Sequence, residues 1–208
     1  MTDYRSSTLI SLMLTIIVLL NFSIKVNASD GEGQFAVRGA GLISCALYTQ
    51  ERAARSEVYL VAAAWVDGYI TGINQHASQT YDLMSFESTE LLMAILDNHC
   101  QTNPSDPIFG VLVNLFKKLW PDRLIDKSDK ATIAIGEREA RHYIELTGRV
   151  QNRLKASGFY KGPRTNEYTP QTMEAMKKFQ TSIGFEPTGF PDQLTLWRLM
   201  RREADPHK

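Results

Sequence analysis

The side chains of this sequence that could carry catalytic chemistry are carboxylates in its first half. Glu51, Glu57 and Asp67 lie in stretches with helical spacing, and Asp67 directly precedes Gly68 beside apolar residues. A carboxyl group in an apolar setting can act as the general acid of a glycoside hydrolase when a second carboxylate faces it. No such partner can be identified from the spacing. The sequence therefore favours a protein without catalytic activity, and a hydrolase with an unrecognised site is the alternative.

Metal and thiol chemistry have equally little support. We expect no metal and no cofactor, because the four histidines show no ligand spacing and no H-E-x-x-H motif is present. Two cysteines, Cys45 and Cys100, remain. A catalytic thiol would need a base nearby and would leave the second cysteine unexplained. A disulfide between them would close a long loop, which stabilises a fold by about 4 kcal/mol in the chain-entropy model.

The amino-terminal residues predict export. An uncharged run from Thr8 to Leu20 follows Arg5, and Val26 and Ala28 occupy the −3 and −1 positions of a cleavage site. The run is short for a membrane span, which takes about 20 residues. We predict a signal peptide over residues 1–28 with cleavage after Ala28, a periplasmic protein and no membrane contact after cleavage. An uncleaved anchor is the alternative. In an oxidising compartment the cysteine pair is expected to form the Cys45–Cys100 disulfide.

Helical periodicity dominates residues 41–120. Ser56 predicts the start of a helix that runs to about His76, Ser88 predicts one that ends near Cys100, and Pro107 opens a third. Gly68 and Gly72 are expected to allow close approach of a neighbouring helix, with room for a ligand or partner as the alternative. The apolar face of the first helix is expected to contain Val58, Val61, Ala62, Trp65, Tyr69 and Ile73.

A polar stretch after Trp120 predicts a domain boundary. We expect a helical domain over 29–125, a linker over 126–146 and a second domain over 147–208. Within the linker, Thr132 to Ile135 is β-prone, and Glu137 to Leu146 could form a helix. Charge divides along the same line: residues 29–146 hold 10 Lys and Arg against 16 Asp and Glu, and residues 147–208 hold 11 against 6.

The carboxy-terminal third predicts three short helices. The first ends at Gly158, the second begins at Thr169-Pro170 and stops at Gly184, and the third begins at Pro191. Inward positions are predicted for Met173, Met176 and Phe179 on the second helix and for Leu194, Trp197 and Leu199 or Met200 on the third.

The motifs of this third are V-Q-x-x-L at Val150, G-F-Y-x-G-P at Gly158, F-Q-x-x-x-G at Phe179 and T-G-x-x-x-x-x-T-x-x-x-L at Thr188. With these motifs the stretch resembles the peptidoglycan-binding domain of cell-wall enzymes and envelope proteins. Two family glycines are replaced by Asn166 and Thr169; asparagine tolerates positive φ and threonine can cap a helix. The resemblance implies a contact surface on the turn after the first helix, which we assign to Tyr160, Lys161, Arg164, Asn166 and Tyr168. Phe159, Phe179 and Trp197 are assigned to the core.

The helical region carries a second resemblance. The matching residues are Cys45, Trp65, Gly68, Tyr69, Gly72, Asn74, Cys100, Asn103 and Pro104. They resemble small disulfide-pinned helical proteins of the periplasm, a group that includes an acid-stress chaperone and immunity proteins. The predicted fold is mostly α with two domains. The resemblances imply peptidoglycan as one partner and an envelope protein as another, with a wall-localised immunity or chaperone role as the alternative. Export and the absence of a matching motif disfavour nucleic acid.

Overall fold

A computed structural model describes residues 29–201 of the chain. The predicted signal peptide, residues 1–28, lies outside the described residues. By its internal contacts the chain divides between Val37 and Arg38. Residues 29–37 contain no helix or strand, and the elements below all belong to the second unit. None of the helices described is long and apolar enough to cross a membrane.

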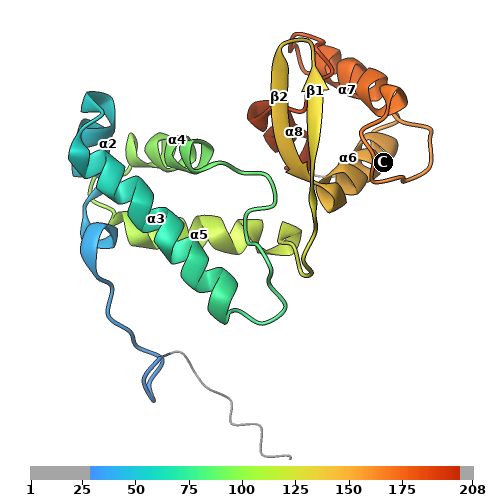
Figure 1. Cartoon of the computed structure of the whole chain (residues 1–208). Coiled ribbons are helices and arrows are strands. Elements are labelled where there is room, and N and C mark those ends of the chain that lie inside the picture. The colour runs from blue at the N-terminus through green and yellow to red at the C-terminus, as the bar shows by residue number, and fades with distance from the viewer. Residues whose placement is uncertain (1–28, 202–208) are drawn as a thin grey trace, which may run out of the picture. The chain divides into compact units, whose positions relative to one another are not determined.

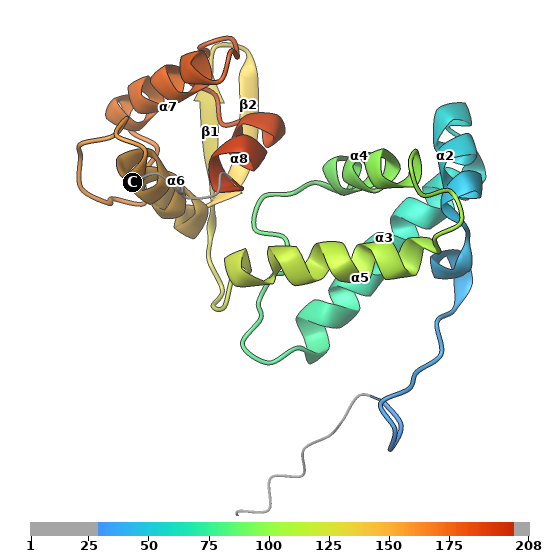
Figure 2. The same ribbon diagram turned by 180° about the vertical axis from the view of Figure 1, so that it is seen from behind.

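Four α-helices form the first half of this unit (Figures 1 and 2), and their bounds are α2 (Cys45–Ala54), α3 (Glu57–His76), α4 (Thr89–Cys100) and α5 (Ile108–Leu119). The short 3-10 turns η1 (Gly39–Leu42) and η2 (Trp120–Asp122) flank them. Serine hydroxyls begin two of the helices as predicted: Ser56 accepts from the Tyr59 amide and Ser88 from the Leu91 amide. The third predicted helix is α5, which starts directly after Pro107.

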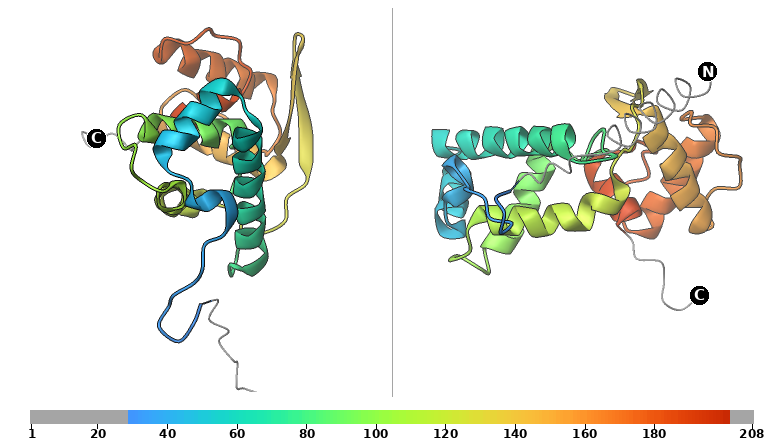
Figure 3. Two further views of the ribbon diagram at one scale, coloured as in Figure 1. Left: turned by 90° about the vertical axis from the view of Figure 1, so that its left-hand side faces the viewer. Right: turned by 90° about the horizontal axis from the view of Figure 1, so that it is seen from below.

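A β-hairpin follows, in the segment expected to be a linker. Strand β1 (Lys130–Ile135) pairs antiparallel with β2 (Arg138–Tyr143), which confirms the β-prone stretch. The possible helix over Glu137 to Leu146 is wrong for residues 138–143, because they form β2 and the helix begins only at Ile144. Gly136 has a φ of 60°, the conformation that the first central position of a two-residue hairpin turn requires. That turn reverses the chain before a helix can begin. The left-hand view of Figure 3 shows the hairpin nearly edge-on.

Three helices complete the unit: α6 (Ile144–Ala156), α7 (Pro170–Ser182) and α8 (Gln193–Met200). The predicted glycine stops are confirmed, since Gly158 and Gly184 have φ values of 80° and 74°. Thr169 caps α7 through its hydroxyl, also as predicted. The third helix begins two residues later than expected because Asp192, not a residue before Pro191, accepts the capping hydrogen bond from Thr195.

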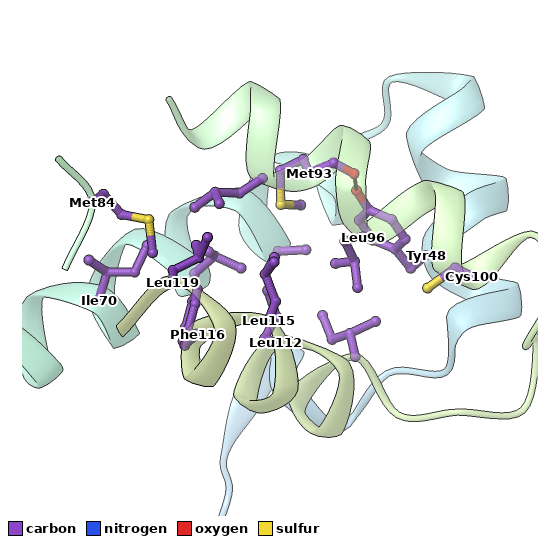
Figure 4. Close-up of a cluster of buried hydrophobic side chains, with 14 of the residues drawn as sticks. Tyr48, Ile70, Met84, Met93, Leu96, Cys100, Leu112, Leu115, Phe116 and Leu119 are labelled. Carbon is purple, nitrogen blue, oxygen red and sulfur yellow. Dashed lines mark hydrogen bonds between the residues drawn. The ribbon is translucent and has the colours of Figure 1, made fainter. Parts of the chain in front are cut away.

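The first hydrophobic cluster lies among the four N-terminal helices (Figure 4). The Cys45–Cys100 disulfide, confirmed here, joins the first residue of α2 to the last residue of α4 inside this cluster. Tyr48 is fully buried beside it, and its hydroxyl donates to the Met93 carbonyl at 2.6 Å, so the one polar atom of the ring is satisfied. The disulfide and this bond both tie α2 to α4.

The predicted inward face of α3 is confirmed in part. Ala62 is buried, and Trp65, Tyr69 and Ile73 pack partly buried against the first cluster, whereas Val58 and Val61 are 42% and 60% exposed. The other buried residues of the helix are Tyr59, Val66 and Ile70. The helix carries apolar residues around most of its circumference, so periodicity alone did not select the buried face. The packing role of the two glycines is also wrong: a Cβ added at Gly68 or Gly72 would meet no atom within 4 Å.

The second hydrophobic cluster is formed mainly by α6, α7 and α8, together with Phe86, Leu124 and Tyr143. Its fully buried residues include Leu154, Met176, Phe179 and Leu196. Phe159 and Trp197 pack against it while partly exposed, in line with their assignment to the core. Two expected inward positions are wrong, because Leu194 is 49% exposed and Met173 is only half-buried. α8 is short and begins at Gln193, which turns Leu194 away from the core.

Polar contacts cross the predicted boundary at residue 126. Arg201, which follows α8, forms an ion pair with Glu87 at 2.5 Å and a second one with Asp122. The side chain of Glu87 is 1% exposed. At the start of α8, Gln193 donates to the Phe86 carbonyl and accepts from the Ser88 amide. At its end, Arg201 bonds to Asp122, so both ends of the helix are tied to residues before the predicted boundary. Hydrogen bonds of this kind fix the orientation of a short helix. The domain limits themselves stay a prediction.

Truncation of Phe179 tests the second cluster. Phe179→Ala should lower the free energy of unfolding by about 3–5 kcal/mol, because it leaves a cavity in place of a ring that is 0% exposed. Lys178→Ala, one residue earlier and exposed, is the control and should change it by less than about 0.5 kcal/mol. Urea unfolding followed by circular dichroism measures both, and equal effects would contradict the assignment.

Candidate functional site

The turn between α6 and α7 contains the five residues predicted to contact a ligand, and the structure separates them. Tyr160 is 3% exposed and belongs to the second hydrophobic cluster, so its prediction as a surface contact is wrong. Its hydroxyl donates to the Pro163 carbonyl at 2.9 Å and closes the turn. Gly162 has no room for a side chain, because an added Cβ would lie 2.5 Å from the Tyr160 hydroxyl.

The remaining four residues lie on the outer part of the turn. Lys161 is exposed. Arg164 is half-exposed, and its guanidinium pairs with Glu145 at 2.5 Å and donates to the Asn166 side-chain oxygen at 2.9 Å. Gly148 of α6 lies directly beneath, since a Cβ there would collide with both Arg164 and Asn166. The turn is therefore seated against α6 through Arg164, which is paired with Glu145, and the exposed Lys161 is a cation on its outer side without an ion-pair partner among residues 29–201.

Asn166 and Tyr168 occupy constrained positions. Asn166 has a φ of 60°, which confirms that asparagine supplies the conformation of the replaced glycine. Tyr168 is half-buried and its hydroxyl donates to the Gly189 carbonyl at 2.7 Å. Burial, followed by the nearby Asp192 carboxylate, raises the pKa of Tyr168 well above its usual value, so this phenol stays protonated at physiological pH.

One buried side chain of α6, Gln151, holds the turn in place. Its amide nitrogen donates to the Thr165 hydroxyl, the Glu167 carbonyl and the Thr172 hydroxyl, each at 3.0 Å. Its amide oxygen accepts from the backbone N–H groups of Thr165 and Asn166. Gln151 is 1% exposed, so these bonds are shielded from water and together fix the backbone of residues 165–167.

A groove of about 660 Å³ runs between this turn and the hairpin. We call it the β1 groove. One wall is strand β1, the other is the segment 165–170, and Ile144, Thr147 and Met173 complete the lining. Asn166 and Tyr168 line it, whereas Tyr160, Lys161 and Arg164 do not. Sequence reasoning missed the β1 wall because that stretch was assigned to a linker, although its β-prone residues were visible.

The inner face of the hairpin covers the helices. Ile133 and His142 are 6% and 8% exposed and contact a small cavity lined by Leu146, Tyr168 and Leu196. The Nε2 atom of His142 has no hydrogen-bond partner among the described residues. Burial, and then the charge of Lys130, lowers the pKa of His142, so the ring is held neutral and acts as part of the packing.

The N-terminal acid candidates have ordinary surroundings. Asp67 is exposed and accepts a hydrogen bond from the Thr89 hydroxyl at 2.7 Å. Glu57 is exposed at the start of α3, and Glu51 is half-buried on α2. Among residues 29–201 no group of three or more His, Cys, Asp or Glu side chains is placed to hold a metal ion.

Comparison with known proteins bears on the second half of the chain. Residues 145–199 match the family model described as "Putative peptidoglycan binding domain". The match covers α6, α7, α8 and the turn that Gln151 holds, and it confirms the predicted C-terminal peptidoglycan-binding domain. No curated protein and no solved structure matched the chain. The resemblance of the N-terminal helices to disulfide-pinned periplasmic proteins stays a prediction.

Replacement of Gln151 tests its role. Gln151→Leu should lower the free energy of unfolding by at least about 2 kcal/mol, because it leaves the backbone N–H groups of Thr165 and Asn166 without partners. Asn152→Leu, next to it on α6 and exposed, should have little effect. Thermal unfolding of both variants measures the difference. An unchanged midpoint for Gln151→Leu would show that the turn does not depend on this amide.

Proposed function

We propose that the protein is an exported, non-catalytic protein that binds peptidoglycan through its C-terminal domain and a second, protein partner through its N-terminal helices. The observation that carries the proposal is the family match over residues 145–199, on a segment whose turn is held by Gln151 and carries the exposed Lys161 and the half-exposed Arg164. Peptidoglycan offers carboxylates and amides, which guanidinium, ammonium and side-chain amide groups can bind.

Two features support export: the sequence of residues 1–28 and the disulfide of the N-terminal helices. The apolar run and cleavage pattern of residues 1–28 are typical of a signal peptide. The Cys45–Cys100 disulfide is typical of an oxidising compartment such as the periplasm. Peptidoglycan lies in that same compartment, so the two proposals require each other.

Two surfaces support a protein partner for the N-terminal helices. On α3, Leu60 and Val61 are 61% and 60% exposed, and the neighbouring Gly68 leaves the helix backbone uncovered. A groove of about 860 Å³ lies between α4 and α5, with Ile95 and Val111 among its apolar lining residues. Apolar surface of this kind is what interfaces bury.

The proposed wall contact is the outward face of the turn, made of Lys161, Arg164, Asn166 and Tyr168. The intact exported protein should co-sediment with purified sacculi. Lys161→Ala combined with Arg164→Ala should weaken this binding by about fivefold, because the exposed Lys161 ammonium and the half-exposed Arg164 guanidinium are both lost. Lys178→Ala combined with Arg198→Ala, which removes the same charge from exposed positions on α7 and α8, is the matched control. A wild-type protein that is folded yet stays in the supernatant would end the proposal.

The non-catalytic part of the proposal has its own test. The protein should release no soluble muropeptides from sacculi over hours, because Asp67 is exposed and bonded to a hydroxyl, whereas a general acid needs a desolvated carboxyl group. Chromatography of the supernatant measures this. Time-dependent release that disappears in Asp67→Asn would establish a hydrolase instead.

A further inference from the structure

The outer edge of strand β1 is open. Ile135 and Arg138 flank the two-residue turn, so Ile135, Ile133 and Ala131 exchange hydrogen bonds with β2 in the alternating antiparallel pattern. The residues between them, Ala134 and Thr132, turn their backbone N–H and C=O groups to the other side. Within residues 29–201 no group donates to or accepts from these four backbone groups.

This open edge faces the β1 groove. All five residues from Ala131 to Ile135 line the groove, and the segment 165–170 forms the opposite wall. In Figure 1, β1 is the strand of the hairpin that lies on the side of α6 and α7. The side chains beside the edge are those of Thr132 and Ala134, which are both exposed. Because both are small, neither can fill the groove. An unpaired strand edge with space beside it accepts an extended peptide as an additional strand.

The domain offers no comparable surface to a sugar chain. Sugars are commonly bound on exposed aromatic rings, which contact their apolar faces. Between Lys130 and Arg201, the one large hydrophobic side chain that is exposed is Leu194. Tyr160 is buried and Tyr168 is half-buried with its hydroxyl bonded within the fold. The peptide part of peptidoglycan therefore fits this domain better than the glycan part.

We propose that the β1 groove binds the stem peptide of peptidoglycan in an extended form, hydrogen-bonded to the backbone of Thr132 and Ala134. The inference rests on the proposed peptidoglycan binding and names the part of the polymer that is bound. One charge in the lining is complementary to such a peptide. Exposed Glu167 in the opposite wall can pair with the amine of the peptide's diamino acid.

Nuclear magnetic resonance tests the proposal on the protein purified from the periplasm and labelled with ¹⁵N. The synthetic tetrapeptide L-Ala-γ-D-Glu-L-Lys-D-Ala should shift the amide signals of Thr132 and Ala134 downfield as their N–H groups become bonded. The amides of Ala131 and Ile133 serve as internal controls, because they are already paired with β2. An oligomer of N-acetylglucosamine should leave all four unchanged.

A matched pair of proline variants isolates the backbone contact. Ala134→Pro removes one outward N–H from β1 and should weaken tetrapeptide binding by about fivefold or more. Glu139→Pro removes the equivalent outward N–H from β2, directly opposite in the register, and should leave binding unchanged. Equal thermal unfolding midpoints for the two variants would show that both substitutions destabilise the hairpin to the same extent, so that a difference in binding reports the lost N–H group.

The outcomes separate this inference from the proposed function. Failure to sediment with sacculi would remove both. Sedimentation with sacculi without tetrapeptide shifts at Thr132 and Ala134, or shifts caused by the sugar oligomer instead, would overturn the stem-peptide inference and leave wall binding intact. Binding that survives Ala134→Pro would also overturn it.

Discussion

The C-terminal domain depends on two buried side-chain amides, those of Gln151 and Gln180. Each is 1% exposed, lies on one helix and holds the loop that leads into the next helix. Gln151 holds residues 165–167 before α7. Gln180 donates to Phe190 and accepts from the Gly189 amide before α8. A primary amide suits this position because it has both donors and acceptors and carries no charge that burial would penalise.

The two arrangements repeat one another. The amide of Gln151 also donates to the Thr172 hydroxyl, and that of Gln180 to the Thr195 hydroxyl. Each of these threonines lies in the first turn of its helix, three residues after the capping residue, and its backbone N–H donates to that cap. The same small set of bonds thus occurs twice, and each set fixes a loop, a helix cap and the start of a helix. Because these bonds add to the stability of the three-helix domain, its hydrophobic core can be small.

The groove follows from this framework. Because Gln151 fixes the backbone of residues 165–167, the wall opposite β1 is rigid, and a ligand there would not have to order it. The other wall is held differently, through Ile133 and His142, which are buried against the helices on the inner face of the hairpin. The hairpin lies ahead of residues 145–199, which the family model matches, so the groove joins a family domain to an element of this chain outside that match.

The sequence by itself determined the local features of the fold. Capping residues such as Ser56, Ser88 and Thr169 and helix-ending glycines such as Gly158 and Gly184 act through bonds within a few residues, so their types identify helix ends directly. The cysteine pair and the three-helix motifs were likewise readable.

What only the tertiary structure decided was which face of an element is covered and by what. The buried face of α3, the burial of Tyr160 and the open surroundings of Gly68 depend on neighbours distant in sequence. The hairpin was missed because a two-residue turn and a short strand pair give a weak local pattern, and because its stability comes from packing on the helices. The groove needs two segments at least 30 residues apart to meet, and no local pattern records that.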